Sequence, residues 1–366
     1  MKIVFYISSM APAGGIERVL SKHINFLSAE NEIILITDDK IKSFYPLPEN
    51  IIHVGLDIDT KLSLEDSKIE RILKIVGTFY ANIKKLRQQI KVVTPDVVYT
   101  AHPLNLLKIV FSFRKLEKII VTEHASINSY NSVYKKIATV FYKKVKILAV
   151  PTKLDSDIYN SLGIPNVYLP NPLSFYPSES AALENKVALN IGRFTDDKQH
   201  LLLLELWSKS EAMANGWKLK IIGEGENYDS IISKIKELKL EENVIIQSPT
   251  KEIIEEYLNS SLFLLTSRAE GFGLVLAEAM ACGVPCISFN CPSGPRDIIN
   301  DRKDGFLIEV GDLEDYVQKI NLLTGDINLR KNLGKNAKMS ISQFSASVIK
   351  EKLNDLVNSN FKPSKW

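Results

Sequence analysis

The sequence has few of the residues that stabilise small secreted or metal-binding proteins. It has only three cysteines, Cys282, Cys286 and Cys291, in a C-x3-C-x4-C pattern with no histidine close by. This spacing is not that of a zinc knuckle, so we expect reduced structural thiols. No apolar run approaches the roughly 20 residues of a membrane span, and the apolar start at residues 1–7 is too short for a signal peptide. We therefore expect a cytoplasmic protein.

The sequence also has little excess of either sign of charge, because the formal net charge of the 366 residues is only +3. The charge is nevertheless divided unevenly: residues 1–182 have 23 Lys and Arg against 17 Asp and Glu, and the remainder is slightly acidic. A basic first half favours an anionic surface or a phosphorylated acceptor, with ordinary solvated charge as the alternative. Nothing in the pattern indicates a nucleic-acid partner. The length is enough for roughly two domains, each with its own core.

The most informative stretch runs from Glu270 to Glu278. Residues 262–266 read as a short buried strand, and Gly271 and Gly273 then allow a close turn of the backbone. Good helix formers follow from Leu274. A helix that begins after a glycine loop directs unpaired N–H groups and a positive dipole end at one point, which suits an anion. The alternative is a glycine turn followed by an ordinary helix with a solvated glutamate.

Glu-Gly-Phe-Gly-Leu-Val-Leu-Ala-Glu, with seven residues between the two glutamates, resembles the signature of the retaining GT-B-fold glycosyltransferases of family 4. The resemblance implies that Glu270 contacts the donor sugar and that Glu278 holds the nucleotide ribose. It also implies that the backbone between them meets the diphosphate and the sugar, which adds Gly271, Phe272, Gly273, Leu274 and Val275 as donor-binding positions.

Three further stretches of the second half are similar to the same family. Gly192-Arg193 ends a predicted strand and Lys198 follows; in the family this pair offsets the charge of the diphosphate. A glycine turn follows the next strand at Gly223, and a loop expected to pack on the nucleobase contains Gln247, Ser248 and Pro249. Asp297 departs from the family, which usually has glutamate there, so only that contact is in doubt.

The first half carries two family matches. Gly14 and Gly15, followed by Glu17-Arg18, match the paired-glycine loop that faces the donor phosphates and the acceptor. A tight turn without ligand is the alternative for these glycines. His124 matches the strand-end histidine that reaches the donor sugar and the scissile phosphate. His102 also follows a predicted strand, but the sequence does not decide between a ligand and a structural role.

The sequence contains only partial versions of two patterns, one that binds a divalent metal and one that binds a dinucleotide cofactor. Asp57-Ile-Asp59 and Asp155-Ser-Asp157 have the D-x-D form of the other large glycosyltransferase fold, but neither stands in that fold's setting, and we reject both as metal sites. The full G-x-G-x-x-G of dinucleotide enzymes is absent after residues 1–7 and after residues 218–222, which disfavours a dehydrogenase. We expect no metal and no cofactor besides the nucleotide-sugar donor substrate.

Alternation of strands and helices in both halves predicts an α/β protein of the GT-B class: two doubly wound, Rossmann-like domains that face a central cleft. The expected domains are residues 1–172 on the acceptor side, with a C-terminal helix at about 342–358 packed back on them, and residues 183–341 on the nucleotide-sugar side. Residues 172–182 are the expected linker, and 62–91 a long polar helix.

Residues 133–146 mix lysines, aromatics and aliphatics at helical spacing. Such a basic amphipathic helix can lie on an anionic membrane surface, and a core helix with a solvated lysine face is the alternative. The family context favours the membrane, because many bacterial members act on lipid-linked acceptors. We therefore consider contact with the cytoplasmic face of the inner membrane.

The expected activity is that of a retaining, metal-independent hexosyltransferase in bacterial surface polysaccharide synthesis. It would move a hexose or N-acetylhexosamine from a nucleotide sugar, taken as UDP-linked with GDP-mannose left open, to a glycan or lipid-linked acceptor. His124, Glu270, Arg193 and Lys198 are the expected catalytic residues. The alternatives are a GT-B-fold sugar-nucleotide epimerase and a non-catalytic module that binds anionic membranes.

Overall fold

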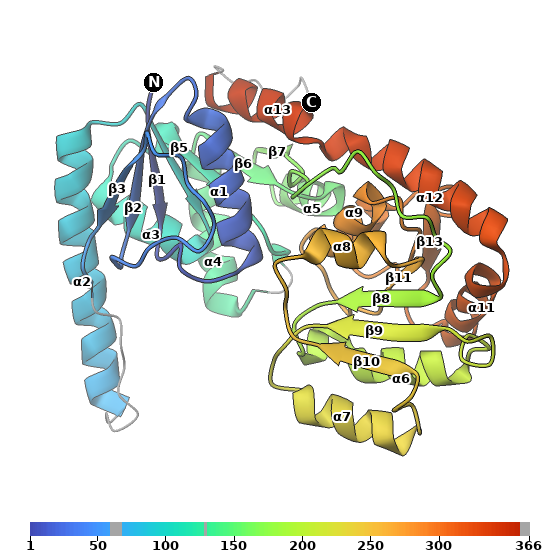
Figure 1. Cartoon of the computed structure of the whole chain (residues 1–366). Helices are drawn as coiled ribbons and strands as arrows, with labels where there is room; N and C mark the ends of the chain where they lie inside the picture. Colours follow the sequence, from blue (N-terminus) through green and yellow to red (C-terminus); the bar gives the residue numbers. More distant parts are fainter. Residues whose placement is uncertain (59–67, 128–129, 359–366) are drawn as a thin grey trace. The chain divides into compact units, whose positions relative to one another are not determined.

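The computed structural model describes residues 1–58, 68–127 and 130–358. The chain forms two compact units, Met1–Pro172 with the C-terminal segment from Ser347, and Leu173–Ala346. Each unit is a parallel sheet with helices packed on it (Figure 1). The predicted α/β class with two Rossmann-like halves is confirmed.

The first unit contains a seven-stranded parallel sheet in the order β3-β2-β1-β4-β5-β6-β7. Its strands are β1 (Lys2–Ile7), β2 (Glu32–Thr37), β3 (Ile52–Gly55), β4 (Val97–Ala101), β5 (Ile119–Thr122), β6 (Ile147–Val150) and β7 (Asn166–Tyr168). Its helices are α1 (Gly15–Leu27), α2 (Lys68–Val93), α3 (Pro103–Ser112), α4 (Ser132–Phe141), α5 (Lys153–Ser161) and α13 (Ala346–Asn358), with short 3-10 turns η1 (Leu116–Lys118) and η3 (Tyr142–Lys144).

The side chains of β1 explain why both faces of this sheet are covered. Ile3 and Phe5 point to a core that includes α1 and α13, whereas Val4 and Tyr6 point to a core that includes α2 and α3. A strand alternates its side chains between two faces, so a strand that is apolar at every position is buried on both.

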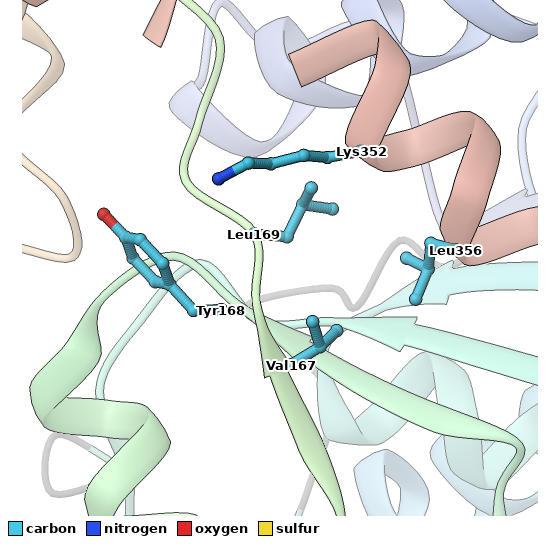
Figure 2. A pocket seen from close by; sticks show the side chains of 5 residues that line it. All are labelled: Val167, Tyr168, Leu169, Lys352 and Leu356. Atoms are coloured by element: carbon cyan, nitrogen blue, oxygen red, sulfur yellow. The ribbon is translucent and has the colours of Figure 1, made fainter. Parts of the chain in front are cut away.

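Helix α13 closes the first of these two cores with four buried side chains, Ile349, Leu353, Leu356 and Val357. Their burial contributes on the order of 6–12 kcal/mol before entropy is subtracted. Figure 2 shows a small hollow between β7 and α13, where Leu356 lies near Val167 and Leu169. Its volume of about 10 Å³ is no more than a single water needs, so it is a packing defect and no ligand site.

Two predicted helices of the first unit differ from the structure. The stretch 133–146 is not one helix, because α4 ends at Phe141 and tightens into η3 before β6. Helix α2 begins at Lys68 and ends at Val93, and residues 62–67 of the predicted helix lie outside the described part of the chain. Among the described residues, no helix is long and apolar enough to cross a membrane.

The second unit contains a six-stranded parallel sheet in the order β10-β9-β8-β11-β12-β13. Its strands are β8 (Val187–Ile191), β9 (Lys218–Ile222), β10 (Val244–Gln247), β11 (Leu262–Leu265), β12 (Cys286–Phe289) and β13 (Gly305–Ile308). Its helices are α6 (His200–Lys209), α7 (Tyr228–Glu237), α8 (Ile253–Leu258), α9 (Leu274–Ala281), α10 (Pro295–Ile298), α11 (Leu313–Gly325) and α12 (Ile327–Ile341), with 3-10 turns η4 (Asp196–Lys198) and η5 (Ser342–Phe344).

This unit begins at Leu173 rather than at 183, because the expected linker packs on it. Leu173 and Ala181 are buried, and their N–H groups donate to the carbonyls of Phe344 and Cys282 at 2.9 and 2.8 Å. A segment held by both burial and backbone hydrogen bonds belongs to the domain core. The three cysteines are free and buried, and burial raises the pKa of each thiol.

Candidate active site

The loop between β11 and α9 is built by glycine. Gly273 has φ of 93° and is the N-cap of α9, a left-handed conformation that glycine adopts without strain. The first hydrogen bond of the helix runs from the N–H of Leu276 to the carbonyl of Gly273. The amides of Leu274 and Val275 therefore precede the first bond of the helix and form its positive end.

The side chain of Phe272 does not belong to this anion site. It is buried and packs against Phe344, with ring centroids 5.4 Å apart. The resemblance assigned this position to donor binding, and its backbone is the part that remains for such a contact.

Lys198 and Glu270, 72 residues apart in the chain, form an ion pair with 2.6 Å between Nζ and Oε1. Their side chains are 21% and 9% exposed. The two loops that carry them are tied together, because the Thr266 hydroxyl donates to the carbonyls of Lys198 and Gln199 and the Arg268 N–H donates to the carbonyl of Asp197. A cation and a carboxylate are thus held together at the loop that leads into α9.

The other predicted residues near this loop follow the next two strands of the sheet, β8 and β9. Gly192 and Arg193 follow β8, and the Arg193 side chain is exposed. Gly223 follows β9, and a Cβ there would lie 2.0 Å from the carbonyl oxygen of Gly192. Gly223 is therefore required by the contact of two backbones, a steric reason that is sufficient without a ligand.

Glu278, the predicted ribose contact, is 2% exposed. Its carboxylate accepts hydrogen bonds from the Ser174 hydroxyl at 2.6 Å and the Tyr257 hydroxyl at 3.0 Å. Ser174 and Tyr257 were not identified from the sequence. They come from the first residues of the unit and from α8, and no motif relates them to α9.

The predicted nucleobase loop follows β10. Gln247 donates its side-chain N–H to Glu256 at 3.0 Å, and Glu256 also pairs with Lys220 at 2.5 Å. Ser248 and Pro249 are exposed. The Gln247 amide is thus held by the protein, whereas the next two residues are open to a ligand.

In the first unit, the paired glycines stand at the start of α1, with Gly14 as the N-cap. A Cβ at Gly14 would lie 2.1 Å from Oε2 of Glu17, so the Glu17 carboxylate folds back over the start of its own helix. Burial raises the pKa of this carboxyl group. At Gly15, a Cβ would meet nothing within 4 Å, which leaves space beside the backbone.

His124 follows β5 directly. Its Nε2 lies 3.1 Å from the Thr122 hydroxyl, and its Nδ1 is buried with no partner among the described residues. Burial lowers its pKa to about 4, so the ring is neutral at pH 7. A neutral imidazole has one nitrogen that donates and one that accepts a hydrogen bond.

His102 has a structural role. It has φ of 74° and caps α3, because its Nδ1 accepts the N–H of Leu104 at 3.2 Å. Its ring packs edge-on against Tyr130 and Tyr134. Burial lowers its pKa.

The two D-x-D pairs can be placed in part. Asp57 forms an exposed ion pair with Lys40 at 2.8 Å, whereas Asp59 lies outside the described residues. Asp155 accepts the Thr152 hydroxyl at the start of α5. Within residues 1–58, 68–127 and 130–358, no group of three or more His, Cys, Asp or Glu could hold a metal ion.

Glu123, next to His124, is a buried residue that sequence reasoning missed. Its carboxylate accepts the hydroxyls of Tyr130 and Tyr142, and burial raises its pKa to about 7. Its own N–H donates to the carbonyl of Ala149 on β6. These contacts fix the backbone from which His124 projects, so Glu123 is a positioning residue. Its position directly after a buried strand was the one available signal.

The raised pKa of Glu123 predicts a pH-dependent stability. Because the pKa of about 7 in the folded state exceeds the ordinary value of 4.5, the contribution of Glu123 to stability is full below pH 4.5 and is lost as pH rises through 7. The loss is about 3 kcal/mol at 1.4 kcal/mol per pKa unit. We expect Glu123→Gln, which still accepts from both tyrosines, to gain stability relative to the wild type by about this amount between pH 4.5 and 8. Urea unfolding at several pH values measures the difference, and a constant difference would contradict the assignment.

The comparisons with known proteins agree with this geometry. Residues 176–340 match the family model "Glycosyl transferases group 1". The chain is 29% identical over 368 residues to the amylovoran biosynthesis glycosyltransferase AmsD of Erwinia amylovora, covering 98% of this chain and 99% of that protein. It is 26% identical over 370 residues to the N-acetylgalactosamine-N,N'-diacetylbacillosaminyl-diphospho-undecaprenol 4-alpha-N-acetylgalactosaminyltransferase of Campylobacter jejuni, covering 94% of this chain and 95% of that protein.

Among solved structures, Alr3699/HepE of Anabaena in complex with UDP-glucose has a similar fold, with a TM-score of 0.77 at 16% identity over 97% of this chain and 98% of that one. The order of elements, the glycine loop before α9 and the family match lead to the same classification. Residues 176–340 are thus similar to the group 1 glycosyltransferases, and the chain has the GT-B fold.

Proposed function

We propose that this glycosyltransferase moves a hexose or N-acetylhexosamine from a UDP-sugar to a glycan or lipid-linked acceptor, with retention of the anomeric configuration, in bacterial surface polysaccharide synthesis. The observation that carries the proposal is the Lys198–Glu270 ion pair at the loop that leads into α9. The names of the relatives from Erwinia and Campylobacter, and the UDP-glucose in HepE, support the pathway and the donor.

The proposed chemistry stabilises the leaving group. When the bond from the sugar to the nucleoside diphosphate breaks, negative charge develops on the β-phosphate. Arg193, Lys198 and the amides of Leu274 and Val275 offset this charge as it develops, which accelerates the reaction because the stabilisation is greater in the transition state. Such a cation set replaces a divalent metal.

Glu270 and His124 have sugar-directed roles in the proposal. On donor binding, Glu270 exchanges part of its contact with Lys198 for a hydroxyl of the sugar, and the lysine turns toward the phosphate. His124, as a neutral ring, aligns the sugar and the scissile phosphate. A phosphate oxygen of the leaving group assists removal of the acceptor proton on the same face, which gives retention.

The acceptor side of the proposal includes peripheral contact with the cytoplasmic face of the inner membrane through residues 133–146. In this stretch Val133 and Val140 are 65% and 44% exposed beside the lysines of α4 and η3. Exposed apolar and basic side chains together suit an anionic lipid surface.

Ligand-observed NMR with the purified chain tests the donor assignment. We expect UDP and one UDP-sugar to bind, GDP and GDP-mannose to bind at least tenfold more weakly, and the affinities and the rate of transfer to be unchanged by EDTA. Preference for a guanosine nucleotide would overturn the donor assignment, and loss of activity in EDTA would overturn the metal-free mechanism.

A further inference from the structure

The first unit carries a basic hollow far from the strand ends used by the proposed function. Its volume is about 490 Å³, within the usual range of ligand pockets. It lies among the end of α2, the turn before β4 and the loop before β5. Those turns precede strands, whereas Gly14 and His124 follow strands, so in a parallel sheet the hollow lies at the opposite edge.

The lining of this hollow is strongly cationic. Five of the ten lining residues are basic and none is acidic: Arg87, Lys91, Arg114, Lys115 and Lys118. No salt bridge within the described part of the chain includes any of the five. The nearest acids in sequence are Glu117, which does not line the hollow, and Asp96, which accepts the N–H of Lys2.

Two of the cations hold the walls in place. Arg87 donates to the carbonyl of Phe111 at 2.6 Å and links α2 to the end of α3, and Lys118 donates to the carbonyl of Pro95 at 3.4 Å. Lys91, Arg114 and Lys115 are exposed. Three uncommitted positive charges gathered on a fixed frame create a positive potential that attracts a phosphate group.

Exposed apolar side chains lie on α2 and next to lining residues in the sequence. Val92 is 75% exposed and Phe111 is 50% exposed, directly beside lining residues in sequence. Along α2, Val76 and Tyr80 are 60% and 71% exposed. They share one helix face with Arg87 and Lys91, because the positions 76, 80, 87 and 91 recur at helical spacing. A soluble phosphate compound makes no use of such a rim, whereas a membrane surface uses both parts.

We propose that this surface, composed of the hollow and the exposed face of α2, docks on anionic phospholipid, with a lipid phosphate held by Lys91, Arg114 and Lys115. Charge complementarity and the apolar rim identify the occupant. The surface is distinct from residues 133–146 and does not depend on the identity of the donor nucleotide.

Vesicle co-sedimentation of the full chain tests this proposal. We expect binding to phosphatidylcholine vesicles that contain phosphatidylglycerol, weak binding to phosphatidylcholine alone, and loss of binding in high salt. Lys91→Ser/Arg114→Ser/Lys115→Ser should weaken partitioning about hundredfold, since each basic residue near an anionic surface contributes about fivefold. The matched control, Lys209→Ser/Lys236→Ser/Lys303→Ser, removes the same charge from exposed positions of the second unit and should retain most of the binding.

Three results would overturn the proposal: equal binding to neutral vesicles, loss of binding in the control variant alone, or binding of sodium pyrophosphate in the hollow without vesicle binding. The three mutated side chains are exposed, so thermal unfolding should be unchanged, and the single variant Lys115→Ser, with an expected fivefold effect, provides a second measurement. Binding of UDP-sugar by NMR reports on the donor assignment separately, because none of these residues belongs to the proposed donor site.

Discussion

Lys198→Ala is expected to lower kcat by about 10²–10³, corresponding to roughly 2.7–4 kcal/mol of lost transition-state stabilisation. The lysine offsets charge that develops on the leaving phosphate, so its effect on kcat should exceed its effect on the KM for donor. The structure supports a fixed position for this charge, because Nζ is already 2.6 Å from Glu270 and the surrounding loop is tied to Thr266.

Steady-state kinetics of the variant with the donor identified by NMR measure this effect. Lys319→Ala is the control, since Lys319 is also partly buried, at 18% exposure, and pairs with a carboxylate at 2.8 Å in the same unit. The substitution at Lys198 leaves Glu270 without its cation at a site that is 9% exposed, which also lowers stability. The double variant Lys198→Ala/Glu270→Gln removes that unpaired charge. A kcat within threefold of the wild type in both variants would show that Lys198 only neutralises Glu270.

The sequence predicted the backbone of this site better than its side-chain contacts. Leu262–Leu265 and Leu274–Ala281 were predicted as strand and helix, because apolar runs and glycine punctuation are local signals. The ion pair of Lys198 with Glu270 was not predicted, since the two residues were assigned separately to phosphate and to sugar. The two residues meet because they follow β8 and β11, which are neighbours in the sheet. The order of strands in a sheet cannot be read directly from a single sequence.

The partners of the buried carboxylates Glu278 and Glu123 could not be predicted from the sequence either. Ser174 reaches Glu278 across 104 residues, and Tyr142 reaches Glu123 across 19. Serine and tyrosine are common in many settings, so nothing local marks them as partners of a carboxylate. Residues 133–146 show the opposite case, in which a local signal is present but misleading. Their periodicity is helical throughout, but the chain must end α4 at Phe141 to enter β6.

Glu278 carries the second large prediction. Its two oxygens accept the hydroxyls of Ser174 and Tyr257, and these contacts fix the orientation of the carboxylate. In the proposed donor complex the carboxylate also accepts a ribose hydroxyl. Hydrogen bonds to a charged group contribute about 1.5–3 kcal/mol, so Glu278→Gln should weaken nucleotide binding about 10- to 100-fold.

Tyr257→Phe separates binding from packing. The phenylalanine keeps the ring contacts with Phe175 and Phe263 and removes only the hydroxyl, which donates to Glu278 at 3.0 Å and also lies 3.3 Å from the carbonyl oxygen of Val275. We expect a few-fold loss of nucleotide affinity by calorimetry, smaller than that of Glu278→Gln, because Ser174 still orients the carboxylate. If Glu278→Gln instead lowered the Tm and left the nucleotide Kd unchanged, Glu278 would be an anchor between α9 and the start of the unit. The ribose contact would then have to come from another side chain.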